Sequence, residues 1–363
     1  MNNRALTAVT LIGALSVVAW LSPMPSHLTD ADVYTQMSRD WFIPGCDDLQ
    51  CFRVLVPWML GLLPGPLLLK WKGFAVLCEA GAGLAMGAWA LRTGASARSA
   101  TQVTWMTAFG SGALYTLFDP YTSDALMHLL GPALMLLLFD SRLGFATVVA
   151  GVGILAKEFA AVPLIVATLI WFQDRRPSQW RPAALASLIV IAWWAAWQVF
   201  TRVGYGYSPG GNPSARLLSG GFIAYWATHI DPGLAVSAIA MALGALWVLW
   251  PLGAVRGPRL VRQLSLAGLP CLLLWCYVQQ PDRALWNFAF VIMPAAAVIL
   301  GALSPVLAWS IVGAHTLVNL RVGAQLSSVP PARFAFIIAI GLALVAAWQV
   351  AAGPRGRLAR SFR

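Results

Sequence analysis

The sequence predicts an all-α, polytopic membrane protein with about 12 transmembrane helices, some of them half-length. Hydrophobic residues make up 59% of the 363-residue chain and charged residues only 10%, against roughly 25% in a typical soluble domain. The mean hydropathy is +0.73. Apolar runs of about 17–25 residues recur along the chain, as expected for helices that cross a ~30 Å hydrocarbon core. The strands of a β-barrel would instead show short alternating segments.

The apolar runs place the spans in order. Residues 5–21 follow a short polar head and lack a small-x-small cleavage site, so we interpret them as a retained helix rather than a signal peptide. We expect residues 1–363 to form a single transmembrane domain with both termini on the same side. The other predicted spans are residues 73–91, 100–118, 124–139, 144–156, 159–172, 183–201, 234–252, 263–279, 284–302, 305–320 and 334–350.

The charge distribution predicts the orientation. With the N-terminus in the cytoplasm, the cytoplasmic segments hold only two acidic residues, Asp140 and Asp174, and the following arginines: Arg4, Arg92, Arg98, Arg142, Arg175, Arg176, Arg181, Arg256, Arg259, Arg262, Arg355, Arg357, Arg360 and Arg363. The net charge of +11 therefore follows the positive-inside rule and does not indicate a nucleic-acid partner. We expect a multi-pass protein of the plasma (inner) membrane, with cytoplasmic N- and C-termini and membrane lipids as partners. Residues 353–363 would form a basic cytoplasmic tail.

Two outer loops are long, residues 22–72 and residues 202–233. In the first loop, Val33, Met37 and Trp41 recur every four residues, which predicts an amphipathic helix over residues 30–41 lying on the membrane surface. Residues 54–69 are apolar enough to cross, but four helix-breaking residues interrupt them: Pro57, Pro64, Gly65 and Pro66. A crossing there would put later arginines outside, so we expect a second helix, either surface-lying or re-entrant, followed by a turn.

Residues 144–172 form one apolar stretch interrupted by Lys157 and Glu158. Both flanking segments carry arginine and are predicted to be cytoplasmic. The chain must therefore go out and return through two half-length helices, with Lys157 and Glu158 near their turn. Because such a turn cannot lie in lipid, we expect it in a recess lined by protein or water.

Polar and ionisable side chains gather at the outer ends of the spans and in the outer loops. Charges close to the membrane are costly and usually mark a functional site. The most prominent are two carboxylates just after the first span, Asp30 and Asp32. The other candidates are Tyr34, Arg53, Asp124, Lys157, Glu158, Asp282 and Arg283.

Two cysteines of the first outer loop, Cys46 and Cys51, would face an oxidising compartment. A short-loop disulfide between them is one possibility. A metal site is disfavoured there because two thiols and one neighbouring residue, His27, do not make a zinc ligand set. The remaining histidines are scattered, so we assign no metal, and dependence on a divalent metal stays open.

The outer-face pattern resembles the integral-membrane glycosyltransferases of the GT-C fold. The resemblance covers mostly the first 170 residues and rests on short motifs. These are the Asp30…Tyr34 spacing after the first helix, two surface helices in the first loop, the segment Phe52-Arg53-Val54-Leu55-Val56-Pro57, and Lys157 within the segment from Leu155 to Pro163. The resemblance implies a GT-C-like architecture and a polyprenyl-phosphate-linked sugar as donor substrate, with no certain cofactor.

On this resemblance, Asp30 would be the general base that deprotonates an acceptor hydroxyl, and Asp32 is the alternative. Arg53 and Lys157 would hold the donor phosphate. Simpler interpretations stay open: both acids could favour the helix N-terminus, and Arg53 could be an interfacial residue that snorkels to the headgroups. Lys157 could pair with an acid other than Glu158, its neighbour in sequence.

The resemblance thus implies a glycosyltransferase that transfers a hexose or pentose to a lipid, glycan or protein acceptor on the outer face of the membrane. A transporter or flippase for a lipid-linked or anionic substrate is the alternative, with Lys157 and Glu158 as a gate. It would need essential charges in both halves of the membrane, whereas the inner half here is nearly free of charge. The donor sugar, the acceptor and the oligomeric state stay open.

Overall fold

The computed structural model describes residues 3–22, 29–208, 243–270, 285–320 and 330–352, and within these residues the chain forms helices and no β-strands. The predicted all-α class is confirmed. The helices of the N-terminal half are α1 (Asn3–Leu21), α2 (Thr29–Asp40), the 3₁₀ helix η1 (Leu49–Phe52), α3 (Leu55–Leu62), α4 (Leu67–Arg92), α5 (Ala97–Ala108), α6 (Ser111–Phe118), α7 (Asp124–Phe139), α8 (Leu143–Gly153), the 3₁₀ helix η2 (Glu158–Ala161) and α9 (Val162–Gln173).

The described helices that follow are α10 (Pro177–Tyr205), α14 (Leu246–Arg256), α15 (Arg259–Gly268), α17 (Ala289–Ala302), α18 (Pro305–Asn319) and α19 (Pro330–Ala352). Within the described ranges, two helices, α4 and α10, are long and apolar enough to cross a membrane. At 1.5 Å per residue, their 26 and 29 residues correspond to about 39 and 43 Å. The predicted spans 234–252 and 263–279 lie partly outside the described residues.

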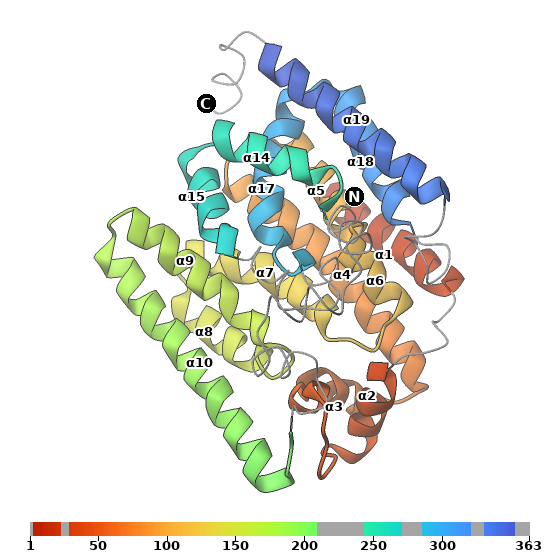
Figure 1. Cartoon of the computed structure of the whole chain (residues 1–363), viewed down its shortest axis with the longest axis vertical. Helices are drawn as coiled ribbons and strands as arrows, with labels where there is room; N and C mark the ends of the chain where they lie inside the picture. The colour runs from red at the N-terminus through yellow and green to blue at the C-terminus, as the bar shows by residue number, and fades with distance from the viewer. Residues whose placement is uncertain (1–2, 23–28, 209–242, 271–284, 321–329, 353–363) are drawn as a thin grey trace, which may run out of the picture.

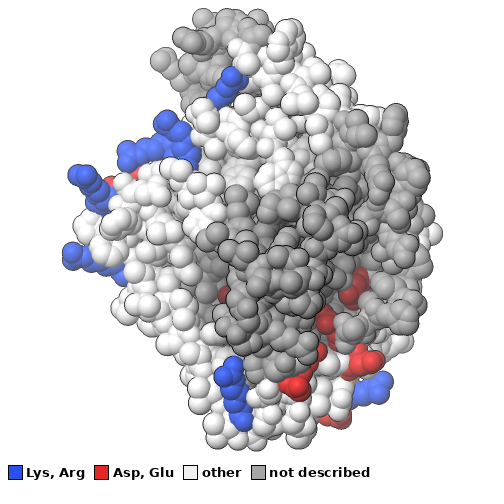
Figure 2. Space-filling model, viewed as in Figure 1, with Lys and Arg blue, Asp and Glu red and all other residues white. Residues whose placement is uncertain are grey.

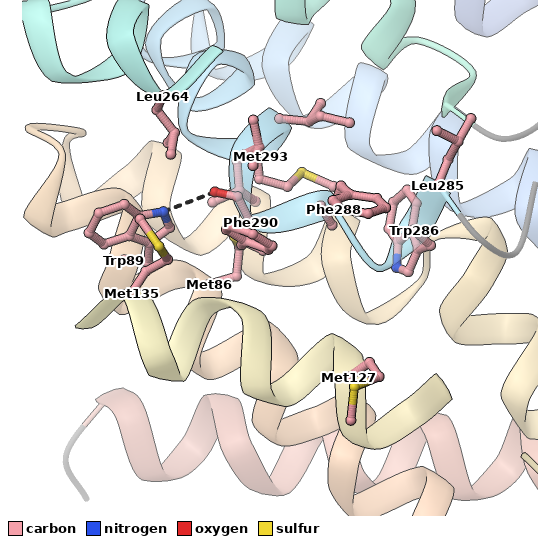
Figure 3. Close-up of a cluster of buried hydrophobic side chains, with 14 of the residues drawn as sticks. Met86, Trp89, Met127, Met135, Leu264, Leu285, Trp286, Phe288, Phe290 and Met293 are labelled. Atoms are coloured by element: carbon pink, nitrogen blue, oxygen red, sulfur yellow. Dashed lines mark hydrogen bonds between the residues drawn. The ribbon is translucent and has the colours of Figure 1, made fainter. Parts of the chain in front are cut away.

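Helix α4 lies at the centre of the fold and packs against α1, α5 and α7 (Figure 1). Its core contacts reach α17, where the indole nitrogen of Trp89 donates a hydrogen bond of 2.9 Å to the carbonyl oxygen of Phe290. Figure 3 shows this bond among buried aromatic and methionine side chains, including Met86 and Met135. The bond gives the buried indole N–H an acceptor; without one, this donor would lower the stability of the fold.

Residues 100–118 do not form one span, and this prediction is wrong. Helix α5 ends at Ala108 and α6 begins at Ser111. A Cβ atom at Gly110 would overlap the indole ring of Trp286, so the ring packs directly on the glycine backbone. The break therefore coincides with a contact to a residue far along the chain, which hydropathy does not report.

The segment 54–69 holds a short helix followed by a turn, as predicted. Helix α3 covers Leu55–Leu62, and residues 67–69 already belong to α4. Eight residues of helix extend only about 12 Å, so α3 is too short to cross a ~30 Å core. It packs against α2, where Gly61 lies on the backbone of Ser38.

The predicted pair of short helices in residues 144–172 is confirmed as local structure. Helix α8 ends at Gly153, Lys157 precedes η2, and α9 begins at Val162. Both short helices pack along α10.

The two ends of α10 lie in different surroundings. Its first residue, Pro177, follows Arg175 and Arg176, while its last turn meets the loop between α2 and η1 (Figure 1). In Figure 2, basic side chains gather along the left edge, over the start of α10 and the α14–α15 region. Acidic side chains gather towards the lower right, over the region of α2.

Candidate functional site

Helix α2 presents Asp30 and Asp32 differently, although both lie in its first turn. Asp30 is half-buried and Asp32 is exposed. Asp30 shares a helix face with Tyr34, four residues on, and Tyr34 is buried. Burial raises the pKa of the Tyr34 hydroxyl, and the nearby Asp30 carboxylate adds to the increase. Tyr34 therefore keeps its hydroxyl proton, and Asp30 lies one turn before it on the same face of α2.

The loop after α2 positions Arg53. Cys46 and Cys51 form a disulfide, and Asp48 caps η1 by accepting a 2.8 Å hydrogen bond from the backbone N–H of Gln50. Inside this closed loop, the Gln50 side-chain oxygen accepts bonds from the Tyr34 hydroxyl at 2.9 Å and from Arg53 Nη1 at 2.8 Å. One amide oxygen thus joins α2 to the Arg53 guanidinium.

The disulfide loop is also fixed to the end of α10. The backbone N–H of Gly45 donates to the carbonyl of Tyr205 at 2.8 Å, and the N–H of Ser208 donates to the carbonyl of Cys46 at 2.9 Å. The Trp197 indole donates to the carbonyl of Phe52 at 2.9 Å. The first outer loop of the prediction therefore rests on α10 rather than standing apart.

The turn between α8 and α9 supplies the remaining charges. Glu158 pairs with Arg53 through Nη2, at 2.9 Å to Oε1 and 3.3 Å to Oε2. Lys157 pairs with Asp124, the first residue of α7. Asp124 also accepts a hydrogen bond of 3.2 Å from Thr122. Lys157 and Asp124 are both buried, so their opposite charges stabilise each other away from water.

The structure brings most of the predicted site residues together. Two ion pairs, Arg53–Glu158 and Lys157–Asp124, lie at the α8–α9 turn, and the charges of Arg53, Asp30 and Asp124 all influence Tyr34. The predicted residues in this cluster are Asp30, Tyr34, Arg53, Asp124, Lys157 and Glu158. Asp32 points away from it, and Asp282 and Arg283 lie outside the described residues.

Gln50 is the site residue that the sequence analysis missed. It is uncharged and lies in a loop, so neither charge nor periodicity marks it. Its position between the cysteines was the only available signal.

We expect Gln50→Leu to lower the free energy of unfolding by about 1–3 kcal/mol, because two buried donors lose a shared acceptor. Gln50→Glu keeps an oxygen at this position and should unfold close to the wild type. Thermal unfolding in detergent measures both, with Gln36→Leu on the exposed side of α2 as the matched control. A Gln50→Leu variant as stable as the control would contradict the bridging role.

A second polar cluster lies deeper, between α4, α6 and α7. Glu79 Oε1 accepts a 2.8 Å hydrogen bond from the Thr116 hydroxyl and lies 2.7 Å from His128 Nδ1. Both Glu79 and His128 are buried, and His128 lies one turn after Asp124 on α7. Neither residue was among the predicted site residues.

The cluster of α2, η1 and the α8–α9 turn offers two cations to an anionic ligand, one bidentate and one a point charge. Among the described residues, no group of three or more His, Cys, Asp or Glu side chains could hold a metal ion. The chain matches no protein-family model, no curated protein and no solved structure. The chemistry of the site must therefore be argued from its residues.

Proposed function

We propose that this protein is an integral-membrane glycosyltransferase that moves a sugar from a polyprenyl-phosphate donor to a lipid, glycan or protein acceptor on the outer face of the membrane. The observation that carries the proposal is that two buried cations, Arg53 and Lys157, pair with acids at the α8–α9 turn, and that Gln50 joins Arg53 to Tyr34 on the same helix as the half-buried Asp30. Cations stabilise the negative charge of a phosphate leaving group, and a carboxylate can accept the proton of an acceptor hydroxyl.

The proposed orientation is supported by the arginines that precede the start of α10. The cluster adjoins its C-terminal end through Trp197 and Tyr205, and Arg175 and Arg176 precede its N-terminal end. If α10 spans the membrane, the positive-inside rule puts the arginines in the cytoplasm and the cluster on the outer face. A disulfide between Cys46 and Cys51 suits an oxidising compartment on that side.

The proposed reaction is a direct displacement. Asp30 accepts the proton of the acceptor hydroxyl as its oxygen attacks the anomeric carbon. The bond from that carbon to the donor phosphate oxygen breaks, and polyprenyl phosphate leaves with the electron pair. Arg53 and Lys157 would stabilise the charge that develops on this phosphate.

Arg53 and Lys157 are already paired with carboxylates. The donor phosphate would therefore have to take the place of a carboxylate beside one of them. The Glu158 side chain is 33% exposed, whereas that of Asp124 is fully buried. Glu158 can therefore move into water at lower cost than Asp124. We expect the phosphate to replace Glu158 as the partner of Arg53. Lys157 stays paired with Asp124, and its positive charge also attracts the phosphate.

Proteoliposomes supplied with labelled polyprenyl-phosphate sugars and an envelope acceptor fraction test the proposal. We expect label in the acceptor with equimolar release of polyprenyl phosphate. Arg53→Gln should raise the donor concentration for half-maximal rate about tenfold or more, because a charge-assisted bond contributes roughly 1.5–3 kcal/mol. Arg39→Gln, on the exposed side of α2, is the control. Equal effects of the two variants, or no transfer with any donor, would contradict the proposal.

The buried Glu79–His128 pair favours a second candidate, a transporter or flippase. Ionisable residues inside a membrane segment often form proton relays, and Glu79 lies near the middle of α4. This candidate predicts movement of an intact lipid-linked substrate across the vesicle membrane, abolished by Glu79→Gln. Transfer of label without such movement rejects it.

A further inference from the structure

Two helix turns meet at the end of the molecule opposite the candidate site. One joins α9 to α10, and the other joins α14 to α15. In the first turn, Asp174 Oδ1 accepts a 2.6 Å hydrogen bond from Gln263 Nε2 of α15 and forms an ion pair with Arg259 Nη2 at 2.6 Å. The other oxygen of Asp174 lies 3.6 Å from Arg176 Nε. This carboxylate, only 13% exposed, fastens the two turns into one surface.

This surface carries far more positive than negative charge. Besides the arginines bonded to Asp174, it holds Arg175, Arg181, Arg256 and Arg262, which form no ion pair within the described parts of the chain. Arg175, Arg181 and Arg262 are exposed. Figure 2 shows the basic side chains of this end together along the left edge. Asp174 is thus the acid of a surface that holds six arginines.

Apolar side chains continue the surface towards the middle of the molecule. Phe172 is 60% exposed and meets Trp180 edge to face, and the Arg181 guanidinium lies 5.6 Å from the Trp180 ring. Val255 on α14 and Leu266 on α15 are also exposed. Aromatic rings beside arginine, followed by apolar residues, are typical of the level where headgroups meet acyl chains.

We propose that this surface, defined by Arg175, Arg176, Arg181, Arg256, Arg259 and Arg262, binds the phosphate headgroups of acidic phospholipids. Arginine forks match phosphate oxygens in two-point hydrogen bonds. The neighbouring apolar residues provide a contact for acyl chains that a free phosphate ion lacks. The binding shares the membrane setting of the proposed function but requires no transfer activity, so the two can fail separately.

Lipid retention tests this surface directly. The purified full-length protein is delipidated in detergent and titrated with phosphatidylglycerol or phosphatidylcholine of identical chains, and bound lipid is counted by native mass spectrometry. We expect preferential binding of phosphatidylglycerol. Replacing Arg175, Arg181 and Arg262 together by Gln should lower its affinity by roughly ten- to a hundredfold, because each basic residue at an anionic surface contributes about a fivefold factor.

Two further variants separate charge from folding. The same three positions changed to Lys keep the charge and should retain most of the binding. The matched control replaces Arg39, Lys70 and Arg202 by Gln, removing three charges near the opposite end, and should leave phosphatidylglycerol binding unchanged. Equal losses in the two Gln variants, or no preference for phosphatidylglycerol in the wild type, would overturn the proposal. Displacement of the lipid by inorganic phosphate at matched ionic strength would also overturn it, because the surface would then bind a free anion.

Discussion

Replacing Asp30 by Asn should reduce sugar transfer by about 10²- to 10⁴-fold, the usual contribution of a general base. Asp30 is half-buried and lies on the face of α2 that carries Tyr34. The amide keeps the size of the side chain but cannot accept the acceptor's proton. The rate of label transfer in proteoliposomes, with donor and acceptor saturating, measures the loss in kcat.

Asp32→Asn is the matched control. It is the same substitution in the first turn of the same helix, so both variants lose one favourable interaction with the helix dipole. Asp32 is exposed and lies about 200° around the helix from Asp30. We expect Asp32→Asn to transfer sugar at nearly the wild-type rate. Full turnover in both variants would refute catalysis by a carboxylate on α2. A loss of activity in Asp32→Asn alone would identify Asp32 as the base.

Much of the helix plan could be predicted from hydropathy and charge. The apolar runs at residues 73–91 and 183–201 fall inside α4 and α10, and the charged interruption at Lys157 and Glu158 marks the turn between α8 and α9. These predictions depend on local composition alone. The crossing of a membrane by the predicted set of about 12 spans stays a prediction, because among the described helices only α4 and α10 have the length and composition for it.

The remaining differences arise from contacts between distant residues. The break between α5 and α6 coincides with the packing of the Trp286 ring on Gly110. Gln50 enters the candidate site only because the loop folds back onto α2. The choice between Asp30 and Asp32 likewise depends on burial, since both carboxylates occupy the first turn of one helix. A single sequence carries no direct signal for any of these.

Replacing Asp124 by Asn should lower the free energy of unfolding by about 3–5 kcal/mol, because it removes the negative charge that faces the buried Lys157. The Asp124 side chain is fully buried, and that of Lys157 is 7% exposed. Asn keeps an oxygen that can accept the Thr122 hydrogen bond, so the change isolates the charge. Denaturant unfolding in detergent micelles measures the effect.

The double variant Asp124→Asn with Lys157→Met separates the charge pair from packing. Lys157→Met alone leaves a buried carboxylate without its cation and should also be strongly destabilising, whereas the double variant buries neither charge and should lose less than about 2 kcal/mol. The two single losses should therefore greatly exceed the loss in the double variant. Losses that simply add would show that each residue acts through other contacts. A stable double variant without transfer activity would then separate the contribution of Lys157 to phosphate binding from its contribution to folding.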